Sequence, residues 1–226
     1  MLSKLAKGLN FLFGNRLRSR KIMLSSSLDY LKRKRVLDRN YFDQVRISTL
    51  ELVSEEIRLR KIEGDVAELG VYKGKFARYL NQYFPDRKLY LFDTFQGFDQ
   101  RDIIAENDKA FSSADQDFSK TSVASVLSRM PFPQNCIPIK GYFPASATGI
   151  DANFVFVSLD ADLFEPIYQG LVFFYPRLAK GGYIFVHDFN NESYPGARKA
   201  VEQFCYEQGV NFIPIPDSAG SAVIAK

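Results

Sequence analysis

Short apolar runs alternate with helical patterns along this chain, from about residue 64 to the C-terminus. A continuous apolar run such as Phe154–Leu159 is typical of a strand that is buried on both faces of a parallel sheet. Apolar residues spaced three and four apart predict helices instead. The pattern predicts strands at 65–69, 89–92, 137–139, 154–159 and 183–186, and helices at about 41–57, 75–83, 122–130, 163–179 and 196–208.

This alternation predicts an α/β fold with a doubly wound, mostly parallel sheet. Two last apolar stretches, 212–215 and 222–225, predict a C-terminal antiparallel hairpin. The pair Gly181-Gly182 is expected to end the helix at 163–179, whose aromatic stripe we assign to the core. Residues 95–120 are polar and irregular, which is long for a structureless connection, so they are a candidate lid or binding loop.

Composition places the chain among globular proteins. Its 226 residues suit one α/β domain with an added segment. Hydrophobic residues make up 46% and charged residues 25%, which argues against disorder. No apolar run approaches the roughly 20 residues that a membrane-spanning helix needs. The cysteines, Cys136 and Cys205, are too few for a disulfide framework, so a reducing, cytoplasmic setting is expected.

The net charge of +4 hides an asymmetry between two parts of the chain. Residues 1–40 contain 11 of the 30 Lys and Arg residues but 2 of the 26 acidic ones, which leaves 19 basic and 24 acidic residues for 41–226. The basic character therefore belongs to an N-terminal extension. We divide the chain into a basic helical extension, 1–40, and a catalytic domain, 41–226.

Apolar residues of the extension share one face of a predicted helix. Such a helix would suit an anionic membrane surface or a docking partner. The alternative is a solvated helix that packs on its own domain or on a second copy, the commoner outcome for a charged segment. The basic run 32–35 has no interleaved aromatic residues, so no specific nucleic acid is expected as a partner. The apolar face consists of Leu2, Leu5, Leu9, Leu12 and Phe13.

A glycine-containing turn follows the first predicted strand, with the spacing E-x-G-x-x-x-G at Glu68, Gly70 and Gly74. Dinucleotide-binding loops have a glycine where Glu68 stands, because a pyrophosphate approaches there. A carboxylate repels a pyrophosphate but suits a cofactor with an ammonium or a sulfonium group. Asp93 ends the next strand, 25 residues on, near the spacing at which an acidic residue accepts hydrogen bonds from ribose hydroxyls. Together these residues point to S-adenosylmethionine.

Titratable residues follow two consecutive buried strands: Asp160 and Asp162 follow one, and His187 and Asp188 follow the next. Because ligands bind at the carboxyl ends of parallel strands, we expect Asp160, His187 and Asp188 to meet. Carboxylates there would hold a divalent cation that orients an acceptor hydroxyl. Otherwise Asp160 or His187 would take the hydroxyl proton as a general base. Asp162 is expected to cap the following helix.

As a set, these segments resemble the macrocin O-methyltransferase (TylF/MycF) family of class I S-adenosylmethionine-dependent methyltransferases. The resemblance runs from about Gly64 to Lys226 and rests on the combination of motifs rather than on any one of them. The motifs are GDVAELGVYKG at 64–74, FDTFQGF at 92–98, KGYF at 140–143, LDADLF at 159–164 and GGYIFVHDF at 181–189.

The resemblance implies a Rossmann-like sheet of seven strands and a cofactor site lined by Glu68, Gly70 and Asp93. It implies methylation of a hydroxyl, often on a sugar of a natural product. It also implies a Mg²⁺ held by the aspartate that matches Asp160 and by a consecutive Asp-Asp pair. That pair reads His187-Asp188 here, and a histidine nitrogen suits Mn²⁺ better than Mg²⁺.

We therefore predict an S-adenosylmethionine-dependent O-methyltransferase that acts on a sugar-like hydroxyl and forms a homo-oligomer. Two alternatives remain: an NAD-dependent oxidoreductase on the same sheet, against which Glu68 argues, and a membrane- or RNA-associated binding module with a vestigial site. Tyr142 and residues 117–122 are expected beside the adenine. The predicted cofactor-binding residues are Glu68, Gly70, Tyr72, Gly74, Asp93, Thr94 and Tyr142. The predicted catalytic residues are Asp160, His187 and Asp188, and the same three would hold Mg²⁺ or Mn²⁺.

Overall fold

The computed structural model describes residues 2–19 and 43–226. The chain divides into two units, Met1–Tyr41 and Phe42–Lys226, which are described separately. The first contains the predicted helix, α1 (Leu2–Arg18), on which Leu5, Leu9, Leu12 and Phe13 are exposed. The basic run at 32–35 lies outside the described residues. Among the described helices, none is both long and apolar enough to cross a membrane.

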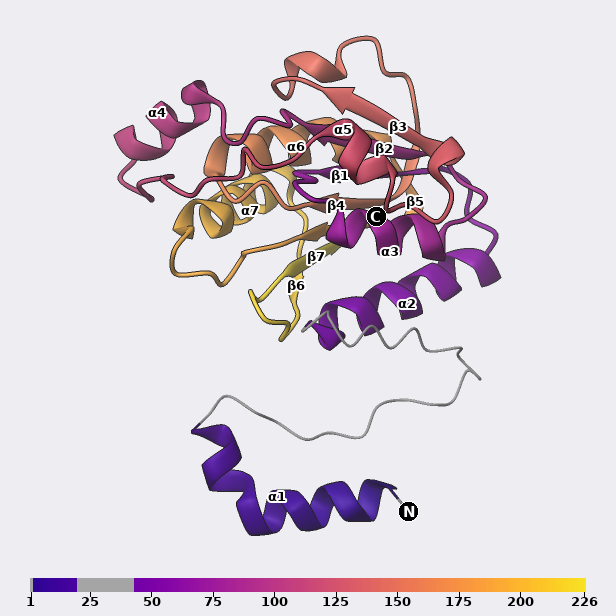
Figure 1. Cartoon of the computed structure of the whole chain (residues 1–226), viewed down its shortest axis with the longest axis vertical. Helices are drawn as coiled ribbons and strands as arrows, with labels where there is room; N and C mark the ends of the chain where they lie inside the picture. The colour runs from indigo at the N-terminus through magenta and orange to yellow at the C-terminus, as the bar shows by residue number, and fades with distance from the viewer. Residues whose placement is uncertain (1, 20–42) are drawn as a thin grey trace. The chain divides into compact units, whose positions relative to one another are not determined.

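Seven strands form one sheet in the second unit, in the order β3-β2-β1-β4-β5-β7-β6 (Figure 1). Neighbours are parallel from β3 to β5, whereas β7 runs antiparallel to both β5 and β6. The predicted doubly wound sheet and its C-terminal antiparallel hairpin are confirmed. The strands are β1 (Asp65–Leu69), β2 (Leu89–Asp93), β3 (Cys136–Lys140), β4 (Phe154–Leu159), β5 (Leu178–Val186), β6 (Ile213–Pro214) and β7 (Ala222–Ala225).

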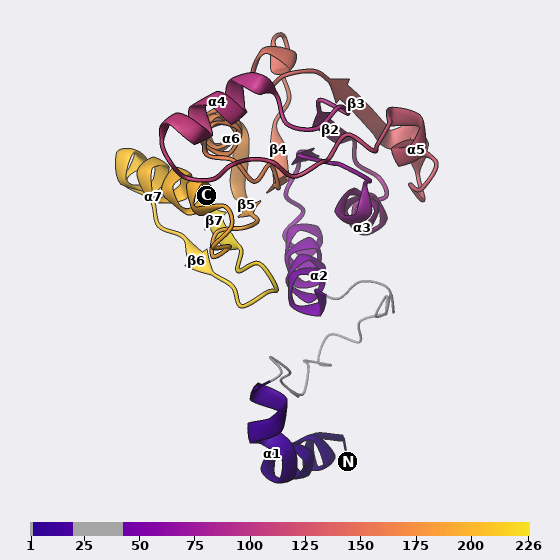
Figure 2. The same cartoon turned by 60° about the vertical axis from the view of Figure 1, so that its left-hand side comes forward.

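Helices cover both faces of this sheet. Figures 1 and 2 show α6 and α7 on one face, together with α4, and α2 and α3 on the other. The helices are α2 (Gln44–Leu59), α3 (Lys75–Tyr83), α4 (Gln100–Asp108), α5 (Val123–Leu127), α6 (Phe164–Arg177) and α7 (Pro195–Gln208), with short 3-10 turns at Pro133–Asn135 and Ala145–Ala147.

The predicted aromatic stripe of α6 lies in the core between this helix and the sheet. Ile167, Leu171 and Phe174 are fully buried. The Phe174 ring packs edge-on against Phe92 and Phe154, with centroids 5.5 and 5.1 Å apart. Each such side chain stabilises the fold by roughly 1.5–3 kcal/mol. This core fixes β2 and β4 against α6, and so fixes the strand ends that carry the site.

Two regions differ from the predictions. The helix α4 lies within 95–120, where no regular structure was expected; its buried residues are the acids Asp102 and Glu106, so hydrophobic spacing could not reveal it. The strand β5 begins at Leu178, so Gly181-Gly182 lies inside the strand instead of ending the helix. The ladder between β4 and β5 shifts register here, and a side chain on Gly182 would lie 2.8 Å from the Val155 carbonyl oxygen.

Candidate active site

Three neighbouring strands, β1, β4 and β5, end side by side, and backbone hydrogen bonds continue beyond their last residues. The Asp160 N–H donates to the Leu69 carbonyl and the His187 N–H to the Leu159 carbonyl, both at 2.8 Å. Asp160 and His187 therefore stand in one row at the carboxyl edge of the sheet, where ligands bind in open α/β folds. The structure thus brings Asp160, His187 and Asp188 together, as the strand order predicts.

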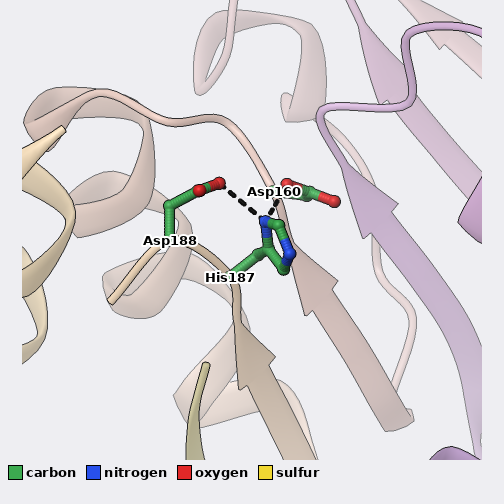
Figure 3. Close-up of side chains that lie close together, drawn as sticks. All are labelled: Asp160, His187 and Asp188. Atoms are coloured by element: carbon green, nitrogen blue, oxygen red, sulfur yellow. Dashed lines mark hydrogen bonds and ion pairs between the residues drawn. The ribbon is translucent and has the colours of Figure 1, made fainter. Parts of the chain in front are cut away.

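The imidazole of His187 lies between two carboxylates (Figure 3). Its Nδ1 is 2.6 Å from Asp188 Oδ2 and 3.0 Å from Asp160 Oδ1. Burial lowers the pKa of this imidazole, but the charge of Asp160 and hydrogen bonds to both aspartates outweigh it and raise the pKa to about 10. Because the Nδ1 proton is hydrogen-bonded to the two carboxylates, Nε2 is the ring nitrogen that remains free to bind a ligand.

Arg46, on α2, holds the other oxygen of Asp160 and was not among the predicted site residues. Its Nη1 donates to Asp160 Oδ2 at 3.0 Å, and its Nη2 donates to Ser158 Oγ at 3.1 Å. The guanidinium carbon lies 3.7 Å from the centre of the Phe76 ring, and the side chain is 2% exposed. Although burial opposes ionisation, the positive charges of His187 and Arg46 hold the Asp160 pKa well below its ordinary value.

Asp162 does not cap α6, contrary to the prediction. The N-cap position is Leu163, which makes no side-chain capping bond; Glu106 of α4 accepts from the Phe164 N–H instead, at 2.9 Å. Asp162 has a left-handed backbone, with φ at 60°, and its carboxyl group interacts with Asp188. Burial and the charge of Asp188 raise the Asp162 pKa well above its ordinary value. Asp162 therefore contacts Asp188 at the end of the neighbouring strand instead of capping the helix.

Glu68 is a buried acid on β1, only 1% exposed, and its Oε2 has no hydrogen-bond partner within the described part of the chain. Burial, followed by the charge of Asp160, raises its pKa well above the ordinary value. Gly70, two residues on, has φ at +84°, and a Cβ there would lie 2.6 Å from the Asp160 carbonyl carbon. Only glycine allows this approach of the two backbones.

Asp93, at the end of β2, holds the glycine turn in place. Its Oδ2 accepts hydrogen bonds from the Val71 and Tyr72 N–H groups at 2.7 and 2.8 Å, and its Oδ1 accepts from the Phe95 N–H at 2.6 Å. The hydroxyl of Thr94 donates to the Gly97 carbonyl, within the segment that follows β2. A carboxylate has about four acceptor positions, so about one remains on Asp93 for a ribose hydroxyl.

Tyr142 follows the end of β3 and lies against α4. Its hydroxyl donates to Asp102 Oδ1 at 3.4 Å, and the Arg101 guanidinium lies 3.5 Å from its ring centre. Burial and the neighbouring charge of Asp99 raise the Asp102 pKa to about 7. Tyr142 is thereby tied to the helix that the sequence pattern did not reveal.

The segment between α4 and α5 crosses the edge of the sheet (Figure 2). Phe118 packs edge-on against Tyr72 of the glycine turn, with ring centroids 5.0 Å apart, and the Thr121 hydroxyl donates to the Tyr72 carbonyl. Further back, Gln116 accepts a hydrogen bond from the Tyr194 hydroxyl, next to α7, at 2.7 Å. Phe118 and Thr121 therefore contact the glycine turn, whereas a place for residues 117–122 beside the adenine and a lid role stay predictions.

One ligand atom from each of Asp160, His187 and Asp188 lies within 4.8 Å of the others, close enough to surround one metal ion. The contacts among these three side chains are hydrogen bonds from His187 Nδ1 to the two aspartates. His187 Nδ1 and Asp188 Oδ2 are 2.6 Å apart and share the Nδ1 proton, so neither atom is open to a metal ion in this arrangement. The imidazole proton and the Arg46 guanidinium also balance the charges of Asp160 and Asp188, so this arrangement disfavours a resident Mg²⁺.

Comparisons with known proteins agree with this architecture. Residues 22–219 match the family described as Macrocin-O-methyltransferase (TylF). A mycinamicin III 3''-O-methyltransferase of Micromonospora griseorubida is 27% identical over 180 residues, which are 74% of this chain and 70% of that protein. The structure of the O-methyltransferase NovP has a TM-score of 0.66 at 19% identity, over 80% of this chain and 79% of that one. The calicheamicin methyltransferase CalS11 has a TM-score of 0.59 at 18% identity, over 79% of each chain.

Proposed function

The chain belongs to the macrocin O-methyltransferase family and is an S-adenosylmethionine-dependent O-methyltransferase, and from this premise we propose how its site works. The methyl group passes to a hydroxyl of a sugar, a sugar-containing natural product or a glycan. His187 takes the proton of that hydroxyl, while Asp160 and Asp188 orient the imidazole. The observation that carries this proposal is the position of His187 Nδ1, 2.6 and 3.0 Å from the two carboxylates.

The methionine end of the cofactor is assigned to the turn after β1. Glu68 supports this, because a buried carboxylate oxygen without a partner among the described residues suits an ammonium or a sulfonium group. The same carboxylate would repel a pyrophosphate, which disfavours the NAD-dependent alternative. Asp93 would accept a hydrogen bond from a ribose hydroxyl at its remaining acceptor position. The other proposed cofactor contacts are Gly70, Tyr72, Gly74, Thr94 and Tyr142.

Methyl transfer is a direct displacement in this proposal. The acceptor oxygen bonds to the methyl carbon while the carbon–sulfur bond breaks, which releases neutral S-adenosylhomocysteine. The acceptor proton passes to Nε2 of His187, because Nδ1 remains the donor to the two aspartates. A positioned base contributes about 10²–10⁴-fold to a rate, and alignment of the oxygen with the methyl group contributes roughly 7–11 kcal/mol in well-oriented systems.

The sulfonium of the cofactor is also proposed to lower the pKa of His187, the base. With a pKa of about 10, His187 is protonated at neutral pH in the free protein. A positive sulfonium near the ring disfavours the imidazolium and lowers its pKa, as Arg46 already does. Cofactor binding therefore favours release of the Nε2 proton, so the base becomes available when the methyl donor is in place.

The sugar acceptor rests on the relatives, of which one is a mycinamicin III 3''-O-methyltransferase. Activation of the hydroxyl by Mg²⁺ or Mn²⁺ on Asp160, His187 and Asp188 is the alternative to base catalysis. The three ligand atoms are near enough for it, but the hydrogen bonds of Nδ1 favour the base.

Methyl transfer to defined sugars tests the proposal. Radiolabelled S-adenosylmethionine is offered with mycinamicin III and with TDP-rhamnose, since CalS11 is a TDP-rhamnose 3'-O-methyltransferase. We expect a methylated sugar from at least one acceptor and S-adenosylhomocysteine binding by calorimetry. Asp160→Asn should abolish turnover with cofactor affinity retained, whereas Asp151→Asn, an exposed aspartate before β4, should leave turnover unchanged. Binding of NAD without S-adenosylhomocysteine, or full turnover by Asp160→Asn, would contradict the proposal.

Residues 1–40 are proposed to form an extension that is separate from the catalytic unit at 41–226. The exposed apolar residues of α1 support a peripheral contact, with an anionic membrane surface or with a second copy in a homo-oligomer. The enzyme is assigned to the cytoplasm, where Cys136 and Cys205 would stay reduced. Burial raises the pKa of both thiols to about 11, which makes them poor nucleophiles.

A further inference from the structure

Arg46 lies outside all of the sequence motifs, yet it is fixed in the site through its backbone as well as its side chain. Its N–H donates to the capping carboxylate of Asp43 at 3.0 Å, and Asp43 accepts in turn from the Ser218 N–H at 3.1 Å. The start of α2 is therefore tied to the loop before β7. From this anchored position the guanidinium reaches Asp160 and Ser158 and stacks on Phe76.

Asp160 accepts hydrogen bonds from two nitrogen donors at once. Arg46 Nη1 lies 3.0 Å from Oδ2, and His187 Nδ1 lies 3.0 Å from Oδ1. An arginine does not lose its proton in proteins, so the charge on Oδ2 is balanced permanently. A divalent cation bound to the same carboxylate would stand beside this guanidinium and be repelled by it. The sequence also offers one carboxylate fewer than an Asp-Asp pair, since His187 occupies the first position.

We propose that Arg46 is a positioning residue that supplies the fixed positive charge of this site, so that Asp160 orients His187 and methyl transfer needs no divalent cation. The inference rests on the proposed O-methyl transfer at the same site. Arg46 holds Oδ2 of Asp160. This leaves Oδ1 for Nδ1 of His187, the contact that Figure 3 draws. Ser158, on the buried strand β4, accepts the hydrogen bond from Arg46 Nη2 and so fixes the orientation of the guanidinium plane.

Manganese binding tests the charge part of this inference without an acceptor. Mn²⁺ is titrated into the complex of the enzyme with S-adenosylhomocysteine, and bound ion is followed by electron paramagnetic resonance. We expect no stoichiometric binding to the wild-type complex at millimolar Mn²⁺. The double variant Arg46→Met, His187→Asp removes the guanidinium and adds a carboxylate, so it should bind one ion. Stoichiometric binding by the wild type that is lost in Asp160→Asn would overturn the inference.

Steady-state kinetics test the positioning part. Arg46→Met should lower kcat by roughly 10- to 100-fold, the usual effect of removing a residue that orients a functional group, with little change in the Kd of S-adenosylhomocysteine. Arg46→Lys keeps the charge without the two-pronged contact, so it should recover part of kcat. Arg58→Met is the matched control on the same helix, because Arg58 is exposed and pairs with Glu55 at the surface. Wild-type kcat in Arg46→Met would overturn the inference.

Chelation separates this inference from the proposed function. Wild-type turnover in EDTA should equal turnover in Mg²⁺; loss in EDTA that Mg²⁺ or Mn²⁺ restores would overturn the inference while leaving the methyl transfer intact. Absence of methyl transfer under both conditions would refute the proposed function, and Mn²⁺ binding would still decide the metal question. Arg46→Met could fail to fold if Asp160 is left unpaired. In that case the kcat of Arg46→Lys relative to the wild type tests the two hydrogen bonds of the guanidinium, and the wild-type measurements are unaffected.

Discussion

Replacing Glu68 by glutamine should stabilise the free protein and weaken cofactor binding. Glu68 is buried, its Oε2 lacks a partner within the described residues, and burial raises its pKa well above 4.5. A raised pKa means that the folded state binds the proton more readily than the unfolded chain does. Stability therefore falls as the pH rises from about 4.5 to the folded-state pKa. Glutamine keeps the shape of the side chain and removes this loss.

The expected gain is the part of the burial cost that comes from the charge, because the glutamine amide is polar and buried as well but carries no charge; we take this part as about 1–3 kcal/mol. One kcal/mol shifts the Tm of a chain of this size by about 2–4 °C. The Tm of Glu68→Gln should thus exceed that of the wild type by roughly 2–10 °C at neutral pH. The difference should shrink toward pH 4.5, where Glu68 is protonated in both states. Circular dichroism melts over this range measure it.

Cofactor affinity should change in the opposite direction. A hydrogen bond to a charged group contributes about 1.5–3 kcal/mol, so calorimetry should show a Kd raised roughly 10- to 150-fold. S-adenosylmethionine carries a sulfonium and an ammonium, whereas S-adenosylhomocysteine carries only the ammonium. A loss of affinity confined to S-adenosylmethionine would show that Glu68 faces the sulfonium, and equal losses for both ligands would show that it faces the ammonium. Glu63→Gln, an exposed residue just before β1, is the control. Unchanged affinity of Glu68→Gln for both ligands would refute the reasoning.

The site makes three further predictions. The kcat/KM for S-adenosylmethionine, which reports the free enzyme, should rise with pH toward the His187 pKa of about 10, because only the neutral imidazole accepts a proton; a flat profile, or the same profile in His187→Gln, would count against this base. Gly70→Ala should lower the Tm and abolish cofactor binding, because its Cβ would lie 2.6 Å from the Asp160 carbonyl carbon. In the control Gly149→Ala, φ is +82° and there is open space around the new Cβ, so its Tm should fall only by the effect of backbone strain. Equal effects of the two substitutions would contradict the steric explanation. Deletion of residues 1–40 should leave S-adenosylhomocysteine affinity unchanged and abolish binding to anionic liposomes, and a loss of affinity would place the extension within the catalytic unit.

The strand ends could be predicted because parallel-sheet geometry converts order along the chain into position in space. Asp160 and His187 each follow a continuous apolar run, and β4 and β5 are indeed neighbours. The glycine turn was similarly readable, since Gly70 marks a left-handed turn at a strand end. These signals are local in the sequence, and the order of strands in the sheet brings the residues together in space.

Arg46, α4 and Asp162 depended on contacts that local patterns do not record. Arg46 stands on the apolar face of the predicted helix, four residues before Leu50, which was a usable sign of a buried charge, but its partner is 114 residues away. The helix α4 buries acids rather than apolar groups. Asp162 fits a capping rule, yet Glu106 from α4 takes that role, and Asp162 interacts with Asp188.

The distance along the chain between Arg46 and Asp160 has a consequence during synthesis. At about 5–20 residues per second, the ribosome delivers Asp160 roughly 6–23 s after Arg46. For that interval α2 has an apolar flank, with Ile47 and Leu50 beside Arg46, and no β4 to receive it. A charge set within such a flank disfavours its association with other nascent chains. Arg46 therefore places a charge in this apolar flank until Asp160, its later partner, has been synthesised.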